Sequence, residues 1–175
     1  MQELILVNEA DEVLGYADKL AAHMGAGSLH RAFSVFIFNA AGEMLLQRRA
    51  EDKYHFPGKW TNACCGHPVR NETTCDAAER RLGEEMGLQV PLREVFSFIY
   101  RAEDAQTGLV EHELDHVLLG ETDEHPRINT AEVAEWRWIS SARLQQELGN
   151  DPHRYTPWFP LAIEKLFAQG LIEPI

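Results

Sequence analysis

The segment over residues 32–38 is apolar on both faces of an expected strand, apart from Ser34. Side chains alternate between the two faces of a strand, so a strand of this kind is stable only where both faces are covered. The rest of the chain must therefore supply a covering layer on each side. This predicts an α+β fold, an α/β/α sandwich in which helices pack on both faces of a mixed β-sheet.

Other short runs rich in β-branched and aromatic residues are expected to complete that sheet. They span residues 5–7, 44–49, 60–65, 95–101, 111–119 and 135–139. No internal repeat, low-complexity tract or linker divides the chain. At 175 residues with 45 % hydrophobic content, it is long enough for one sizeable core, so we expect a single domain over residues 1–175.

Two segments carry the end signals of helices, and the first begins near residue 73. Thr73 or Thr74 can cap a helix that runs through Met86, and Gly87 is placed to end it. A shorter helix is expected over residues 141–148.

The last expected helix starts at Thr156 and stops at Gly170. It carries Phe159, Ile163 and Phe167 at four-residue spacing, which predicts one apolar stripe against the sheet.

Composition limits the partners and the compartment. No apolar stretch approaches the roughly 20 residues that cross a bilayer, and no secretory signal is expected. Cys64, Cys65 and Cys75 lack the spacing of a disulfide framework, so we expect reduced thiols and a cytoplasmic location. We also expect a monomer. The net charge of −12 argues against binding to nucleic acid or to an anionic membrane.

An anionic ligand would therefore need a local group of cations or a metal ion. One basic cluster exists, formed by Arg48, Arg49, Lys53 and Lys59 together with His55. The alternative is a solvated loop in which Glu51 and Asp52 pair with these cations.

Histidines and carboxylates are the candidate metal ligands. Side chains two apart share a face of a strand, so Glu111, Glu113 and Asp115 point the same way. Cys65 and His67 share a face if the strand that begins at Trp60 extends that far, whereas His23 and His30 flank Gly25 and Gly27 in an expected flexible connection. Three imidazoles and two carboxylates would fill five positions of an octahedron suited to manganese, zinc or iron. The alternative is solvated carboxylates and surface histidines.

The segment from Gly66 carries the most specific pattern. Five residues separate Gly66 from Glu72, and seven more precede the run Arg80-Arg81-Leu82-Gly83-Glu84-Glu85-Met86-Gly87-Leu88. This resembles the Nudix box, G-x5-E-x7-R-E-U-x-E-E-x-G-U with U an aliphatic residue, except that Arg81 replaces a glutamate. Such a loop and helix can hold Mg²⁺ against a diphosphate. The alternative is a surface helix with Arg80–Glu84 and Arg81–Glu85 ion pairs.

Within the Nudix superfamily, nearly the whole chain resembles the type I isopentenyl diphosphate isomerases. The resemblance rests on residues 23–33, Arg48-Arg49, Trp60-Thr61-Asn62-Ala63-Cys64-Cys65-Gly66-His67-Pro68, Tyr100-Arg101-Ala102, Glu111-His112-Glu113 and Thr156-Pro157-Trp158. It implies a Nudix-like fold and the conversion of isopentenyl diphosphate to dimethylallyl diphosphate.

The resemblance also implies which residues hold metal and substrate. One divalent metal, Mn, Mg or Zn, would be held by His23, His30, His67, Glu111 and Glu113. Glu85 would hold a Mg²⁺ that arrives with the substrate, while the diphosphate would be bound by Lys19, Arg49, Lys53 and Arg81. Arg81 thus places a cation near the phosphates where hydrolases keep a carboxylate.

The implied catalytic residues are Cys65, Glu113, Tyr100 and Trp158. An alkene is a poor base, so the reaction needs a strong proton donor and a dry shelter for a tertiary carbocation. We predict that Glu113, assisted by Tyr100, protonates the terminal carbon and that Cys65 removes a proton from the opposite face. Cys64 is expected to face away, and Trp158 would offer its π face to the cation. Without the resemblance, Trp158 is a core aromatic residue.

Two rival functions remain open from the sequence. A Nudix diphosphohydrolase would use Glu84 and Glu85 to activate a metal-bound water. A noncatalytic domain would use the metal only to stabilise the fold, which predicts a closed metal site with no adjacent cavity lined by Cys65 and Trp158.

Overall fold

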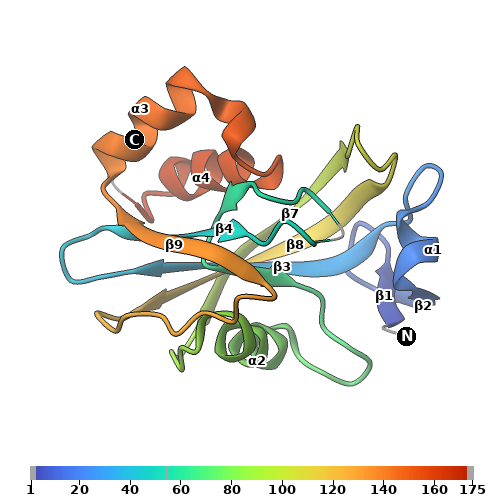
Figure 1. Ribbon diagram of the computed structural model, residues 1–175. Helices are drawn as coiled ribbons and strands as arrows, with labels where there is room; N and C mark the ends of the chain where they lie inside the picture. The colour runs from blue at the N-terminus through green and yellow to red at the C-terminus, as the bar shows by residue number, and fades with distance from the viewer. Residues whose placement is uncertain (1–2, 54, 173–175) are drawn as a thin grey trace.

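Residues 3–53 and 55–172 are described in a computed structural model (Figure 1). Its strands are β1 (Glu3–Val7), β2 (Val13–Asp18), β3 (His30–Phe38), β4 (Met44–Arg49), β5 (Trp60–Thr61), β6 (Cys64–Gly66), β7 (Arg93–Glu103), β8 (Val110–Glu121) and β9 (Val133–Ile139). Its α-helices are α1 (Lys19–His23), α2 (Thr74–Met86), α3 (Ser141–Asn150) and α4 (Trp158–Ala168). No helix of the described ranges is long and apolar enough to cross a membrane.

One mixed, curled sheet contains these strands. β3 lies at its centre, parallel to β8 and antiparallel to β1, β4 and β6. β7 extends the sheet beyond β8, and β9 extends it beyond β4. The strand pairing sets His30 beside Glu113 and Tyr100 beside Glu113, so residues far apart in the sequence meet at one end of β8.

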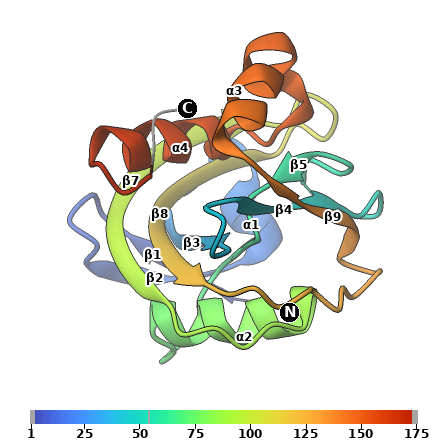
Figure 2. The same cartoon turned by 90° about the vertical axis from the view of Figure 1, so that its left-hand side faces the viewer.

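Helices cover both faces of the sheet. Figure 2 shows α2 below the sheet and α3 and α4 above it. Alternate residues of β3 join two different cores: Phe36 packs with Phe159 and the α4 side, whereas Val35 and Ile37 pack on the α2 side with Leu82. The predicted α/β/α arrangement is therefore confirmed, and both faces of β3 are buried as expected.

The helix ends follow the sequence signals. Thr73 caps α2, its hydroxyl accepting from the Asp76 amide at 3.1 Å. Gly87 ends the helix with φ 65°, and a Cβ there would lie 2.7 Å from the Arg127 carbonyl oxygen, so glycine is required. The predicted short helix is also present, as α3.

The stripe on α4 differs from the expectation. Phe159 and Ile163 are buried, but Phe167 is 45 % exposed and Leu166 is buried instead. A helix advances about 100° per residue, so a residue eight positions on lies about 80° away from the starting face, whereas one seven positions on lies about 20° away. The four-residue spacing overextended the stripe by one turn.

The expected continuous strand over residues 60–65 is wrong. β3 and β4 pair only at Phe38 and Met44, next to their hairpin, and then separate. The segment fills the gap between them, with β5 on β4 and β6 on β3. At the crossing, the Asn62 side-chain amide donates to the carbonyl oxygens of Val35 and Cys64 at 3.1 and 2.6 Å. The break is therefore stabilised by a side chain that satisfies backbone groups.

The amino-terminal region holds two unexpected elements, β2 and α1. Asp18 caps α1 by accepting from the Leu20 amide at 2.9 Å. His23 is the last residue of this helix and His30 the first of β3, and both are fully buried. The expectation that these two histidines lie in a flexible connection is therefore wrong, because only the intervening loop connects the elements.

Candidate active site

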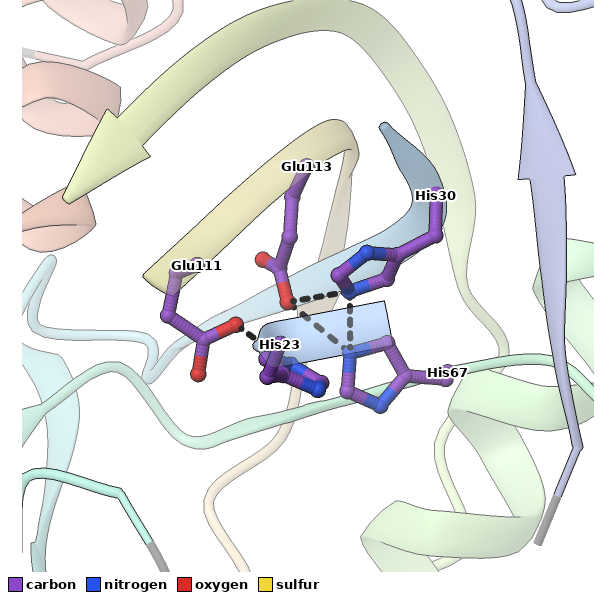
Figure 3. Close-up of side chains that lie close together, drawn as sticks. All are labelled: His23, His30, His67, Glu111 and Glu113. Atoms are coloured by element: carbon purple, nitrogen blue, oxygen red, sulfur yellow. Dashed lines mark hydrogen bonds and ion pairs between the residues drawn. The ribbon is translucent and has the colours of Figure 1, made fainter. Parts of the chain in front are cut away.

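Three histidines and two glutamates converge in the interior (Figure 3). They are His23, His30, His67, Glu111 and Glu113, and their candidate ligand atoms all lie within 4.8 Å of one another. The Nε2 atoms of His30 and His67 are 3.3 Å apart, and His67 Nε2 is 2.8 Å from Glu113 Oε1. This set contains the five residues proposed from the sequence, and its mixed nitrogen and oxygen donors suit manganese, zinc or iron.

Backbone carbonyls fix the orientation of two of these rings. His23 Nδ1 lies 2.6 Å from the Lys19 carbonyl oxygen, and His30 Nδ1 lies 2.8 Å from that of Ser28. A carbonyl only accepts, so each Nδ1 carries a proton and each Nε2 is the ring nitrogen that faces the cluster. This arrangement is typical of metal-ligating histidines, because the second nitrogen is held by an outer acceptor.

The two glutamates are perturbed in opposite directions. Burial opposes ionisation of Glu113, but hydrogen bonds with His30 and His67 outweigh it and hold the pKa of that carboxyl well below its usual range. Burial and the neighbouring Glu113 charge raise the pKa of Glu111. Burial also raises the pKa of Tyr100 well above its ordinary value, so its hydroxyl keeps the proton that it donates to Glu113 Oε2 at 2.5 Å.

A cavity of about 400 Å³ opens beside this cluster. Its lining includes both Cys65 and Trp158, which is the feature that a closed structural metal site would lack. The other residues proposed from the sequence that line it are Lys19, Arg49, Lys53, His67, Arg81, Tyr100, Glu111 and Glu113. His23, His30 and Glu85 lie outside this lining.

The two adjacent cysteines lie on opposite sides of β6. Cys64 is fully buried in the core on the α2 side, whereas Cys65 packs toward the α4 side and reaches the cavity. Arg49 Nη1 is 3.6 Å from the Cys65 sulfur. Burial raises the pKa of the Cys65 thiol to about 12, and the Arg49 guanidinium opposes this shift.

Trp158 forms part of an aromatic wall of the cavity. Its ring lies 5.7 Å from that of Phe56 and 6.1 Å from that of Tyr100, measured between centroids. Its indole Nε1–H donates to Asn62 Oδ1 at 3.2 Å, which fixes the ring orientation. The polar edge of the indole is thus satisfied, and the Arg49 guanidinium lies over the ring, 5.7 Å from its centroid.

Ion pairs fill the other end of the cavity. Lys53 and Arg81 each contact both Glu85 and Glu132. Gln47 also donates to Glu85 Oε2 at 3.0 Å, and the Glu85 side chain is only 2 % exposed. Two of the four cations proposed to bind an anion, Lys53 and Arg81, are therefore already paired with carboxylates.

Comparisons with known proteins identify the family of this chain. The NUDIX domain model matches residues 28–159. The chain belongs to the NUDIX family. It is 46 % identical over 166 residues to the isopentenyl-diphosphate Delta-isomerase of Halorhodospira halophila, a match that covers 94 % of this chain and 95 % of that protein. It is 48 % identical over 159 residues to the enzyme of the same name from Nocardia farcinica, covering 91 % of each. This NUDIX chain therefore also belongs to the isopentenyl-diphosphate Delta-isomerase family.

A solved structure supports the NUDIX fold. The crystal structure of a Deinococcus radiodurans protein, DR0079, superposes with a TM-score of 0.70 at 24 % identity, over 85 % of this chain and 90 % of that one.

In this NUDIX chain, the sequence motif begins in the loop before α2 and continues along that helix. Glu72 Oε1 accepts from Arg80 Nε at 2.7 Å, and this pair ties the loop to the helix. Arg81, the position that departs from the motif, turns to the cavity and pairs with Glu85. The ion pairs expected of an ordinary surface helix are thus present, but Arg81 and Glu85 are not on an ordinary surface.

Sequence reasoning missed two residues of this region. Glu132 lines the cavity, yet it lies just before β9 without any motif around it. His55 was noted only as part of a basic cluster, but it is buried with its ring 4.4 Å from that of His23 and its Nδ1 3.6 Å from Glu111 Oε1. Burial lowers the pKa of His55 to about 3, so it is a neutral neighbour of the cluster rather than a cation.

Proposed function

We propose that this chain is an isopentenyl-diphosphate Delta-isomerase, which interconverts isopentenyl and dimethylallyl diphosphate. The observation that carries the proposal is the lining of one cavity by Cys65, Glu113 and Trp158, beside a His/Glu cluster. This supports an isomerase over a diphosphohydrolase. A thiol can transfer a proton at carbon and an aromatic wall can shelter a carbocation, whereas neither group activates water. The names of the relatives favour the same choice.

The chemistry follows from the residues around the cavity. Glu113, hydrogen-bonded to Tyr100, delivers a proton to the terminal carbon, and the alkene π electrons form the new C–H bond. The tertiary cation that remains is stabilised by the Trp158 ring, a contribution of roughly 2 kcal/mol when desolvated. Cys65 then takes a proton from the neighbouring carbon, and the electrons of that C–H bond become the new double bond.

The resting protonation states match one direction of this scheme. Glu113 is ionised because its pKa is held low, and Cys65 is a thiol because burial raises its pKa to about 12. These are the states from which the reverse reaction starts, with the thiol as acid and the carboxylate as base. The forward reaction requires one prior proton exchange, which the Arg49 guanidinium beside the sulfur assists by favouring the thiolate.

A divalent metal, Mn, Mg or Zn, would be held by the cluster of His23, His30, His67, Glu111 and Glu113. Such an ion would supply fixed positive charge beside the carboxylates and so hold Glu113 in position. Mg²⁺ carried by the substrate diphosphate would meet Glu85. Lys19, Arg49, Lys53 and Arg81 would bind the phosphate oxygens.

We further propose that the chain forms one catalytic domain and works as a monomer in the cytoplasm. The three free cysteines support a reducing compartment. The net charge of −12 supports a small-molecule partner rather than nucleic acid or an anionic membrane.

The test is to incubate the purified protein with isopentenyl diphosphate and Mg²⁺. An isomerase conserves the diphosphate and yields an acid-labile allylic product, whereas a hydrolase releases phosphate. Phosphate release without an allylic product would refute the isomerase assignment.

A further inference from the structure

Glu132 is paired with two of the four cations that the proposed function assigns to the diphosphate. It contacts Lys53 and Arg81, and it lies in the cavity lining. Carboxylates and phosphates are bound by the same charge-assisted hydrogen bonds from these side chains. Glu132 therefore makes with Lys53 and Arg81 the contacts that a phosphate group would make.

The two carboxylates of this end differ in how firmly they are held. The Glu85 side chain is 2 % exposed and accepts from Gln47, whereas the Glu132 side chain is 28 % exposed. The backbone around Glu132 is nevertheless fixed, because its carbonyl accepts from the Ala50 amide at 3.0 Å. A ligand can therefore displace the Glu132 side chain without moving the loop.

Charge decides which ligand achieves this. Lys53 and Arg81 are each paired with two carboxylates, so a free diphosphate must compete for cations that already have partners. A diphosphate that carries Mg²⁺ brings positive charge that the carboxylates attract. The competition from Glu132 thus penalises the free anion more than the metal complex.

We propose that Glu132 is a specificity-determining residue. It makes the cationic end of the cavity, around Lys53 and Arg81, select metal-complexed diphosphate over the free anion. This rests on the proposed function, because that function places the diphosphate at Lys53 and Arg81.

The test is binding of inorganic pyrophosphate, measured by calorimetry on the protein as purified, with and without added Mg²⁺. For Glu132→Gln, the affinity without Mg²⁺ should tighten by about tenfold, roughly the loss of one charge interaction, and change less than about threefold with Mg²⁺. Glu132→Asp keeps the charge and should retain the metal dependence of the wild type.

Glu135→Gln is the matched control. Glu135 lies three residues further on in β9, pairs with Arg48 at 3.2 Å and has a side chain that is 55 % exposed, so the same charge is removed outside the cavity. It should bind pyrophosphate like the wild type under both conditions.

The outcomes separate this inference from the proposed function. If the wild type binds with Mg²⁺ but Glu132→Gln leaves the affinity without Mg²⁺ unchanged or weaker, the role of Glu132 is refuted alone. Equal tightening with and without Mg²⁺ refutes it too, since no selectivity is lost. If the wild type does not bind pyrophosphate even with Mg²⁺, the diphosphate site and this inference both fail.

Discussion

The two ends of the cavity are built on different principles. At the His/Glu end, the side chains are at most 10 % exposed, the candidate ligand atoms lie within 4.8 Å, and nitrogens of His23 and His30 are fixed by backbone carbonyls. At the cationic end, Lys53, Arg81 and Glu132 have side chains that are 16 to 28 % exposed and satisfy one another as ion pairs. The His/Glu end is already arranged to hold a metal ion. The cationic end must exchange its carboxylate partners before it can accept a phosphate group.

The difference follows from the elements that carry each end. The His/Glu residues sit on or next to β3, β6, β8 and α1, where strand pairing sets the register. Glu132 and Lys53 lie outside the strands and helices, in segments beside β9 and after β4. A site on paired strands is more rigid than one on loops, so we expect a stable metal site and an adjustable substrate site.

Cys65 lines the cavity that both ends share, and its removal should stop turnover while leaving both ends intact. General acid–base catalysis contributes on the order of 10²–10⁴-fold, so Cys65→Ala should reduce kcat by about 10³-fold. Metal content and pyrophosphate binding should be unchanged. Cys64→Ala is the matched control, since Cys64 is buried in the other core, and it should retain turnover. Normal kcat in Cys65→Ala would refute the assigned role.

Removal of a metal-ligating side chain should affect the His/Glu end alone. His67 contacts both His30 and Glu113, so His67→Ala should weaken Mn²⁺ binding by at least about 100-fold, more than the loss of an outer-shell partner. Titration calorimetry and metal analysis would measure this. His125→Ala, which removes a histidine from outside the cluster, should bind Mn²⁺ normally. Equal loss of pyrophosphate affinity in His67→Ala would contradict the independence of the two ends.

The aromatic wall should contribute to the rate of the reaction without affecting metal binding or diphosphate binding. Trp158→Leu removes a π face worth roughly 2 kcal/mol, so kcat should fall about 30-fold with little change in KM. Trp158→Phe retains a ring and should lose less. If the two variants are equally impaired, the ring contributes packing rather than stabilisation of the cation.

How well the sequence predicted each region depends on how local its determinants are. The cap at Thr73 and the glycine at position 87 act within one helix turn, so α2 could be predicted closely. The five His/Glu residues were proposed through motifs spread over segments 23–30, 67 and 111–113. Their convergence is a property of strand register, such as the pairing of His30 with Glu113, which no single segment encodes.

The features that the sequence did not predict share a physical cause. The break between β5 and β6 depends on the separation of β3 from β4, and the role of Glu132 depends on a loop that returns beside Lys53. Neither is a property of local propensity or periodicity. His23 was placed in a loop because Gly25 and Gly27 follow it, although α1 needs only one turn of helix to bury it.

The Glu147 cluster is a third polar assembly, and it provides the limiting case for this comparison. Arg137 Nη2 is 2.6 Å from Glu147 Oε2, Arg143 Nε is 2.8 Å from Oε1, and the Tyr155 hydroxyl donates at 2.9 Å. The Glu147 side chain is 7 % exposed, whereas that of Arg143 is 65 % exposed. Both oxygens of the Glu147 carboxylate already accept hydrogen bonds from these side chains, so this cluster should serve stability alone.

Acid should therefore weaken this cluster in a defined range. The hydrogen bond from Arg137, with those from Arg143 and Tyr155, lowers the pKa of Glu147 from 4.5 to about 2. A lowered folded-state pKa stabilises the protein above pH 4.5, and this contribution is lost as the pH falls toward 2. Because Arg143 is exposed to solvent, we expect only about 1 kcal/mol. Glu147→Gln should lower the urea midpoint at pH 7 and narrow its difference from the wild type at pH 3.

The exposed Glu164 on α4 supplies the control, since Glu164→Gln should leave the urea midpoint unchanged at both pH values. Turnover and pyrophosphate binding of Glu147→Gln at pH 7 should match the wild type, because Glu147 lies outside the cavity lining. A constant difference between Glu147→Gln and the wild type across this pH range would mean that the cluster stabilises through packing and not through the carboxylate charge. The Glu147 cluster would then stabilise the fold in the same way as an apolar contact. Its contrast with the cationic end of the cavity would rest on side-chain exposure alone.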